Sequence, residues 1–452
     1  MNKDIIISQA EMVTRLLDEK QFTALRAELE RRNAADVAAL FDELPAETLP
    51  LLFRLLPKEL AADTFVEMDS DAQRLLIKGF SDSELKEVVE ELYVDDAVDI
   101  VEEMPANVVV RILDQADPDT RKMINEIMRY PEDSAGSIMT TEFVALRENY
   151  SVEDAIKRLR RTAVEAESID VCYVIKPDRM LVGYITIRTL IVSPADAQIG
   201  KIMQSDVISV STGEDKETVA QIMQKYNFSA IPVVDGDNRL AGIVTIDDAV
   251  DVLQDEATED IQKMAAITPS DKPYLKTNAF AIYRHRIPWL MLLMVSATFT
   301  GMIITRFENA LAACVTLTAY IPMLMDTGGN SGSQASVTVI RSLSLNEIRF
   351  RDILQVVFKE FQVSIMCAVT LAVCNFAKLM LIDKVGLMVS TVVCLSLMVT
   401  VVIAKLIGCS LPMFAKKLGF DPAVMASPFI TTLVDALSLL VYFGIASHVL
   451  QL

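Results

Sequence analysis

One stretch constrains the fold of this chain more than any other: a polar, glycine-rich run enclosed in a long apolar region. Residues 310–340 contain a single charge, Asp326, yet their middle holds Gly328, Gly329 and Gly332 among Asn, Ser and Gln. Three such glycines weaken a helix by roughly 1 kcal/mol each relative to Ala, and unpaired backbone groups in hydrocarbon cost several kcal/mol each. We therefore expect a discontinuous membrane helix whose broken middle lines an aqueous path. A glycine-rich helix-packing face is the alternative.

The C-terminal part contains five segments that are long enough to cross ~30 Å of hydrocarbon. These segments are 287–305, 310–340, 361–382, 385–404 and 423–447. Ten basic residues flank them on one side and three on the other. Because basic flanks stay on the cytosolic side, this predicts a multi-pass protein of the inner membrane with its N-terminal domains in the cytosol and its C-terminus outside.

Asp435 lies in the middle of the last segment, with Thr431 and Thr432 one turn earlier on the same helix face. A carboxylate at this depth costs at least ~2.5–3.5 kcal/mol on insertion scales, so it is a functional candidate by default. A helix–helix hydrogen bond is the structural alternative. Since one carboxylate is a weak ligand for a divalent ion, we expect a homodimer that brings two copies of Asp435 to a two-fold axis. Lys405 is expected to reach the cytosolic interface in a structural role.

Charge divides the chain into two unlike parts. The 452 residues carry a formal net charge of −20, but only 10 basic and 8 acidic residues follow position 286, which leaves 32 basic and 54 acidic residues before it. An acidic soluble part repels nucleic acid and attracts cations. Six cysteines without a C-x-x-C pair and two histidines argue against a zinc site or a disulfide framework. No nucleophile–base pair or phosphate loop is visible, so we expect no enzymatic activity.

Residues 33–118 have an internal repeat of twelve residues in which an amphipathic helix ends at a residue that also starts the next helix. The repeated positions are Pro45, Pro57, Asp69, Ser81, Pro105 and Asp117. Short helices in series bury their faces by stacking, which predicts a small helical solenoid. The carboxylates of Asp95, Asp96 and Asp99 are expected on a solvated face, with metal contact as the alternative.

Residues 134–255 have a second repeat of about 60 residues, in which β-rich runs alternate with amphipathic helices. Met139 and Met203 occupy equivalent positions in the two copies, as do Gly183 and Gly242. This alternation predicts an α/β unit.

The acidic run from Asp247 to Asp260 leads from this unit toward the membrane part and contains seven carboxylates and no base. Helical spacing places these acids on shared faces, where like charges destabilise a helix by a few tenths of a kcal/mol per pair. A hard divalent cation with oxygen ligands would relieve the repulsion. A soluble acidic helix is the alternative.

Two resemblances connect these parts. The run from Pro322 to Gln334, Pro-Met-Leu-Met-Asp-Thr-Gly-Gly-Asn-Ser-Gly-Ser-Gln, resembles the signature of the MgtE family of magnesium channels and transporters. The 60-residue repeat resembles a tandem pair of CBS domains, in which a Gly-x-x-Thr-x-x-Asp ending often holds an adenosyl ribose. The second copy keeps that ending as Gly242, Thr245 and Asp248, whereas the first copy has Thr189 in place of the acid. ATP at the CBS pair therefore stays an open alternative.

The resemblance to MgtE implies a multidomain membrane protein. Its parts are an all-α superhelical domain (1–130), an α/β tandem CBS module (134–255), a connecting helix (256–280) and an all-α transmembrane domain with five helices (281–452). The family implies that Mg²⁺ is both transported and regulatory, that a hydrated ion is held by Asp435, and that the Gly328–Asn330 turn lines the pore with Thr431 and Thr432. The metal-binding residues it implies elsewhere are Asp95, Asp215, Glu217, Asp248, Glu256, Glu259 and Asp260.

Two departures from the family pattern are Asn227, where an acid is common, and Ser427 before Pro428.

Two other functions remain open at this point. One is a secondary transporter for another divalent cation such as Mn²⁺ or Co²⁺, and the other is a nucleotide-sensing CBS receptor that transports nothing. The expectation that the sequence favours is a homodimeric Mg²⁺ channel that cytosolic Mg²⁺ closes.

Overall fold

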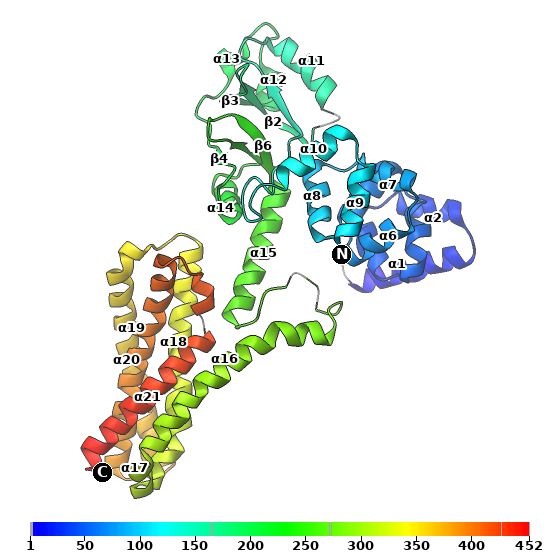
Figure 1. Cartoon of the computed structure of the whole chain (residues 1–452). Helices are drawn as coiled ribbons and strands as arrows, with labels where there is room; N and C mark the ends of the chain where they lie inside the picture. Colours follow the sequence, from blue (N-terminus) through cyan, green and yellow to red (C-terminus); the bar gives the residue numbers. More distant parts are fainter. Residues whose placement is uncertain (1–2, 164–165, 271, 273, 426, 452) are drawn as a thin grey trace. The chain divides into compact units, whose positions relative to one another are not determined.

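The structure, a computed structural model, describes residues 3–163, 166–270, 272, 274–425 and 427–451. The chain forms two compact units, Met1–Leu253 and Gln254–Leu452 (Figure 1). The first contains a series of short helices and both α/β repeats, and the second contains the long apolar helices.

The series of short helices follows the predicted period of twelve. Its elements are α1 (Lys3–Asp18), α2 (Phe22–Leu29), α3 (Ala34–Asp42), η1 (Ala46–Thr48), α4 (Leu49–Phe53), α5 (Lys58–Val66), α6 (Ser70–Gly79), α7 (Asp82–Val89), α8 (Val94–Glu103), α9 (Ala106–Gln115) and α10 (Pro118–Ile127). All six repeated positions of the sequence are helix N-caps, and Tyr93 is a seventh in the same phase. Each of these residues ends one turn and starts the next helix. The twelve-residue repeat of the sequence is therefore the spacing between successive N-caps.

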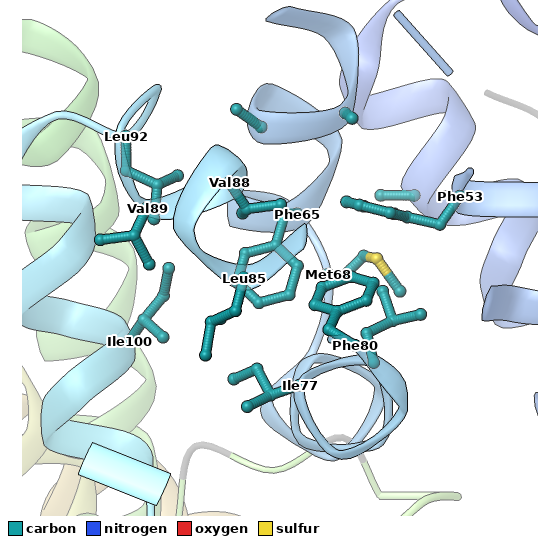
Figure 2. Close-up of a cluster of buried hydrophobic side chains, with 14 of the residues drawn as sticks. Phe53, Phe65, Met68, Ile77, Phe80, Leu85, Val88, Val89, Leu92 and Ile100 are labelled. Carbon is teal, nitrogen blue, oxygen red and sulfur yellow. The ribbon is translucent and has the colours of Figure 1, made fainter. Parts of the chain in front are cut away.

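The same period fills the core of this helical series. Phe53, Phe65, Ile77, Val89 and Val101 lie twelve residues apart, and each is at most 5% exposed. Figure 2 shows the first four of these side chains converging between neighbouring helices. Equivalent positions of successive repeats therefore build one continuous apolar core.

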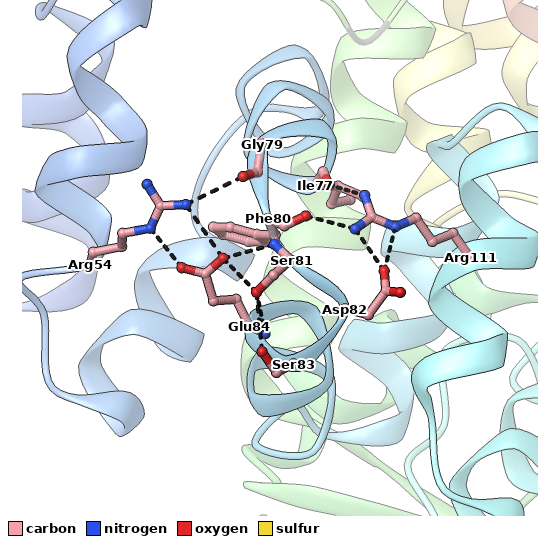
Figure 3. A network of polar contacts seen from close by, with 9 residues as sticks. All are labelled: Arg54, Ile77, Gly79, Phe80, Ser81, Asp82, Ser83, Glu84 and Arg111. Carbon is pink, nitrogen blue, oxygen red and sulfur yellow. Dashed lines mark hydrogen bonds and ion pairs between the residues drawn. The ribbon is translucent and has the colours of Figure 1, made fainter.

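Polar contacts fix the spacing between the repeats (Figure 3). The Nε atom of Arg54 donates to Glu84 over 2.6 Å, and Glu84 also accepts the backbone N–H of Ser81 in a capping box. These hydrogen bonds, with that from Arg54 the strongest, lower the pKa of Glu84 to about 2. Arg111 of α9 contacts the same helix, α7, through Asp82 at 3.0 Å.

Each α/β repeat has the same three-stranded sheet, with a parallel pair followed by an antiparallel pair. The first copy contains β1 (Phe143–Leu146), α11 (Val152–Thr162), β2 (Ser168–Ile175), β3 (Leu181–Thr186), α12 (Ile187–Val192) and α13 (Ile199–Ile202). The second contains β4 (Val210–Ser211), α14 (Lys216–Tyr226), β5 (Ala230–Val234), β6 (Leu240–Thr245) and α15 (Ile246–Met264).

The two copies are interlocked at the positions that the repeat marks. A Cβ atom on Gly242 would lie 2.5 Å from the carbonyl oxygen of Thr140 and 2.8 Å from the Sδ atom of Met139. A Cβ atom on Gly183 would lie 2.7 Å from the Sδ atom of Met203. The methionine of each copy thus packs on the glycine of the other, which explains why both residue types recur.

The connecting helix differs from its predicted range of 256–280. It is α15, which begins directly after β6 and ends at Met264. No breaker stands between Asp247 and Met264, whereas Ala266 has a positive φ of 53°, which an α-helix does not tolerate.

The second unit contains the end of α15, followed by the apolar helices and their connections. These are α16 (Ala279–Arg306), α17 (Glu308–Ala313), η2 (Val315–Tyr320), α18 (Ile321–Ser344), η3 (Phe350–Asp352), α19 (Ile353–Leu381), α20 (Leu387–Lys417), η4 (Pro422–Met425) and α21 (Ser427–Leu450). Four of the described helices are long and apolar enough to cross a membrane: α16, α19, α20 and the helix that ends at Leu450. The 24 residues of α18 span ~36 Å, but this helix is not among the four. The five-span count therefore stays a prediction.

The expected break at the glycine-rich run is wrong. α18 is one continuous helix through Gly328 and Gly332, and the irregular backbone lies earlier, in η2. A Cβ atom on Gly408 of α20 would lie 2.2 Å from the carbonyl oxygen of Gly332, so the backbones of α18 and α20 are in direct contact there. This close packing offsets the low helix propensity of glycine, and the glycines form the helix-packing face that was the alternative.

Candidate functional site

Three carboxylates from three separate segments meet in the first unit. Asp95 is in the first turn of α8, Glu167 directly precedes β2, and Asp248 is in the first turn of α15. One carboxylate oxygen from each lies within 4.8 Å of the others. Carboxylate oxygens in this number and proximity are the ligands that Mg²⁺ and Ca²⁺ take in proteins. We call these three residues the acidic centre.

Hydroxyl groups offset only part of the charge of the acidic centre. Asp95 is 6% exposed, and its Oδ1 atom and the Oε2 atom of Glu167 are buried without a hydrogen-bond partner. Burial, and then the neighbouring carboxylates, raise the pKa of Glu167 to about 7 and that of Asp95 well above its ordinary value. Buried acceptors normally have a partner. The unpaired oxygens and raised pKa values therefore fit a site that holds either protons or a cation.

The sequence predicted two of these three carboxylates as metal-binding candidates and did not predict the third. Asp95 and Asp248 were predicted to bind metal, and the structure brings them together. Glu167 carries no sequence signal, because it lies in a loop and becomes a candidate only when folding places it beside Asp248.

The expectation that the acids of α8 form a solvated face is wrong for Asp95 and Asp96. Asp95 is buried, and burial followed by the charge of Glu167 raises the pKa of Asp96 to about 7. Asp99, one turn later, is exposed as a residue, but burial of its carboxyl group, followed by the charge of Asp248, raises its pKa to about 7.

A hydroxyl orients one ligand of the acidic centre. The Oγ1 atom of Thr245 donates to the Oδ2 atom of Asp248 over 2.6 Å. In the first copy the equivalent positions, Thr186 and Thr189, lie 3.0 Å apart through their hydroxyl oxygens. The two copies therefore differ: one ends in an orienting hydroxyl and a carboxylate, the other in a pair of hydroxyls.

The predicted acids on α14 lie outside the acidic centre. Asp215 is the N-cap of α14 and accepts the backbone N–H of Thr218 over 3.0 Å. Glu217 accepts a hydrogen bond from Gln221 at 2.9 Å. Asn227 ends this helix in the left-handed conformation, at φ 54°. Asn adopts the left-handed conformation more readily than apolar residues do, which gives a backbone reason for Asn at this position.

The end of α15 contacts the apolar helices within the second unit. The Oγ atom of Ser344, the last residue of α18, donates to Asp260 over 3.0 Å. The Nζ atom of Lys263 lies 2.7 Å from both Glu259 and Asp421. Glu256, one turn earlier, is half-buried. The acid-bearing helix is thus attached to α18 by its last two turns.

Two carboxylates, one on α18 and one on α21, are close enough to interact electrostatically. Asp435 is half-buried on α21, and Asp326 on α18 is its principal charged neighbour. Asp326 was noted in the sequence only as the single charge of its segment. The exposed face of α18 has a polar side chain at every fourth position: Asp326, Asn330, Gln334 and Thr338. Polar groups on an exposed helix face are unfavourable in hydrocarbon, so this stripe needs contact with water or with protein.

Some of the other predicted pore residues pack against neighbouring helices, and others are exposed. Gly328 and Gly329 are buried, and a Cβ atom on Gly329 would lie 3.0 Å from the Cγ2 atom of Thr431. Asn330 is exposed. The hydroxyls of Thr431 and Thr432 both donate to the carbonyl of Pro428, each over 2.9 Å. The side chain of Ser427, before that proline, lies outside the described residues.

The expectation that Lys405 extends to the interface is wrong. α20 continues to Lys417, so Lys405 lies well inside the helix, is 4% exposed, and has its Nζ atom 4.0 Å from Glu360 on α19. The predicted span 385–404 stops one residue before this charge, whereas the charge is paired inside the helix bundle.

Comparison with known proteins covers all these parts. Residues 321–445 match the MgtE family, described as divalent cation transporter. Residues 32–133 match the MgtE intracellular N domain, and residues 135–195 and 199–255 match CBS domains.

The magnesium transporter MgtE of Thermus thermophilus is 37% identical over 443 residues, which cover 96% of this chain and 97% of that protein. The magnesium transporter MgtE of Bacillus subtilis is 34% identical and covers 96% of this chain and 95% of its own length. A crystal structure of the cytosolic domain of the Mg²⁺ channel MgtE in complex with ATP has a TM-score of 0.52 and 38% identity, over 54% of this chain and 99% of that one. With the helical domain, the CBS pair and the transporter domain all matched in order, the chain belongs to the MgtE family.

Proposed function

We propose that this protein is a Mg²⁺ channel in which hydrated Mg²⁺ moves down its electrochemical gradient along α18 and α21. The observation that carries this proposal is the exposed polar stripe of α18, which includes Asp326, the charged neighbour of Asp435. Mg²⁺ loses its water reluctantly and prefers oxygen ligands. A path with carboxylates and amide groups holds the ion through its water shell and avoids most of the dehydration cost.

A homodimer completes this path. The polar stripe of α18 is exposed in one copy, and a second copy related by a two-fold axis would cover it with an identical stripe. Two copies of Asp435 would then supply two negative charges to one divalent ion. The lipid bilayer surrounds the pair, with the acidic first unit in the cytosol and the C-terminus outside. An inside-negative membrane potential favours entry by ~4.6 kcal/mol per 100 mV for a divalent ion.

Cytosolic Mg²⁺ closes the channel by binding the acids of the soluble part. The acidic centre supplies Asp95, Glu167 and Asp248, and the unpaired oxygens of Asp95 and Glu167 support a cation there. Glu256, Glu259 and Asp260 on α15, with Asp215 and Glu217, supply further carboxylates. Since the end of α15 bonds to Ser344 of α18, ordering of α15 by bound Mg²⁺ favours one conformation of the path-lining helix. This is a population shift by a ligand that prefers the closed state.

Nucleotide is a second ligand of the soluble part. A relative's cytosolic domain was solved in complex with ATP, and the second CBS copy of this chain has Gly242, Thr245 and Asp248 for a ribose. Titration of the full chain with ATP by calorimetry tests this, and Asp248→Asn is expected to abolish the heat of binding.

The decisive experiment is ion flux into liposomes that contain the purified protein. We expect Mg²⁺ uptake that stops in Asp435→Asn and that internal Mg²⁺ inhibits in the unmodified protein. Flux in Asp435→Asn equal to that of the unmodified protein contradicts the path. Uptake of Mn²⁺ or Co²⁺ in preference to Mg²⁺ identifies the other divalent transporter, and no uptake of any ion identifies the receptor.

A further inference from the structure

The first apolar helix is longer than a membrane requires. α16 has 28 residues, which span ~42 Å, whereas the hydrocarbon core is ~30 Å thick. The 20 residues that end at Arg306 account for that thickness, so the turns before Ile287 lie among the lipid headgroups. Pro288 stands at this boundary and interrupts the backbone hydrogen bonds of the helix there.

The first turns of α16 and the residues just before them expose aromatic and apolar side chains. Tyr274 is 69% exposed, Leu275 86%, Phe280 73% and Tyr283 55%. The rings of Phe280 and Tyr283 lie 6.0 Å apart as a tilted pair. A soluble surface seldom exposes such a group of large side chains, while aromatic rings are enriched at the membrane–water interface. We call residues 274–289 the entry segment.

The entry segment has the opposite charge to the part of the chain before it. No acidic residue occurs from position 272 to 307, although the chain has a net charge of −20. Arg284 and Arg286 are exposed, and among the described residues no ion pair of either arginine is found. An exposed guanidinium without a carboxylate is free to bind an anion, and its planar fork matches phosphate oxygens.

His285 stands between Arg284 and Arg286 in the sequence, and the preceding loop contacts it. The backbone N–H of Thr268 donates to the carbonyl of His285 over 3.0 Å, and the imidazole Nδ1 atom lies 3.1 Å from the Thr268 carbonyl oxygen. The preceding loop therefore covers the helix side of His285. Side chains two residues apart on a helix point to different sides. Arg284 therefore lies on the side of Phe280 and Arg286 on the side of Tyr283, and the two arginines reach different headgroups.

We propose that the entry segment binds anionic phospholipids of the cytosolic leaflet, with Arg284 and Arg286 holding their phosphate groups. The occupant is a lipid because the exposed rings and the start of a membrane span lie at the same level as the charges. A basic residue at an anionic membrane surface contributes ~1 kcal/mol, which corresponds to a preference for anionic over zwitterionic lipid of about fivefold per arginine. The proposal needs only that α16 enters a bilayer and does not depend on the ion path.

The chain contains its own reporter for this preference. Trp289 is the only tryptophan, and it lies one turn after the two arginines. We would place the full-length protein in mixed bilayers of phosphatidylcholine and phosphatidylglycerol and brominate the acyl chains of one lipid at a time. Brominated phosphatidylglycerol should quench Trp289 more strongly than brominated phosphatidylcholine at equal mole fraction. Soluble glycerol phosphate at the same ionic strength should leave this difference unchanged.

The variant Arg284→Gln/Arg286→Gln should quench equally with both brominated lipids. Quenching that remains strong with phosphatidylcholine shows that this variant is still inserted. Arg349→Gln/Arg351→Gln is the matched control, because it removes two exposed arginines with the same spacing from the segment before α19, and it should keep the preference. Equal quenching by both lipids in the unmodified protein, or loss of the preference in the control, overturns the proposal.

Discussion

The acidic centre predicts that Glu167→Gln stabilises the metal-free protein and that Mg²⁺ removes most of this difference. Glu167→Gln removes one of three carboxylates whose oxygens lie within 4.8 Å of one another. At an effective dielectric constant near 20, two charges at that distance repel by ~3.5 kcal/mol. The substitution removes two of the three repulsions while it keeps the shape of the side chain.

Protonation limits the size of this repulsion. The pKa of Glu167 is raised from 4.5 to about 7, which corresponds to about 3 kcal/mol against its charged form. Without metal at pH 8 we therefore expect Glu167→Gln to be more stable than the unmodified protein by about 2–3 kcal/mol. With Mg²⁺ at 100 times its dissociation constant, the unmodified protein gains ~2.7 kcal/mol, and the variant should gain much less because it has lost a ligand.

The assay is thermal unfolding of the soluble part, residues 1–264, with and without Mg²⁺. The corresponding parts of two relatives were solved without their membrane helices. A difference of 1 kcal/mol corresponds to roughly 2–4 °C for a unit of this size. Asp170→Asn is the matched control, because it removes an exposed acid from β2 outside the acidic centre. If Glu167→Gln melts below the unmodified protein without Mg²⁺, or shows the same Mg²⁺-induced shift, the acidic centre is not a cation site.

Three other outcomes are expected. Because folding raises the pKa of Glu167 and Asp96 to about 7, the metal-free soluble part should lose stability as pH rises from 4 through 7, and its Mg²⁺ affinity in calorimetry should rise from pH 6 to 8 as protons stop competing. Gly408→Ala should prevent correct assembly of the apolar helices, seen as aggregation in detergent, because its Cβ would lie 2.2 Å from a carbonyl oxygen; Gly444→Ala, with nothing within 4 Å, should behave normally. Lys405→Met should lower the unfolding temperature in detergent, since removing one partner of a buried ion pair typically costs 3–5 kcal/mol, and a further substitution of its partner by Gln should restore most of the loss.

The repeats in the sequence predicted much of the fold. The twelve-residue repeat predicted the helical solenoid because a cap is a local feature: the side chains of Asp69, Ser81 and Asp117 accept backbone N–H groups within three residues. The 60-residue repeat predicted the paired α/β unit for the same reason, since its strands and helices alternate along the chain. Long apolar runs predicted a membrane part, although the count of five spans rests on α18.

The prediction for the glycine-rich run was wrong because it considered only the local sequence. Glycine propensity predicts a broken helix around Gly328 when the segment is considered alone. The backbone contact of Gly332 with Gly408, 76 positions away, makes the same glycines necessary for a continuous helix. Propensity is a weak effect that tertiary packing overrides.

The candidate sites follow the same division. The sequence alone determined which residues are candidates for a divalent cation, because acids in a membrane span or in an uncompensated run are unfavourable without one. Asp435, Asp248 and Asp260 were predicted in this way. Only the tertiary structure decided which of them act together. Asp95, Glu167 and Asp248 are far apart in the chain, and only folding brings their oxygens within 4.8 Å. Ligand geometry depends on distances in space, which a one-dimensional pattern does not contain.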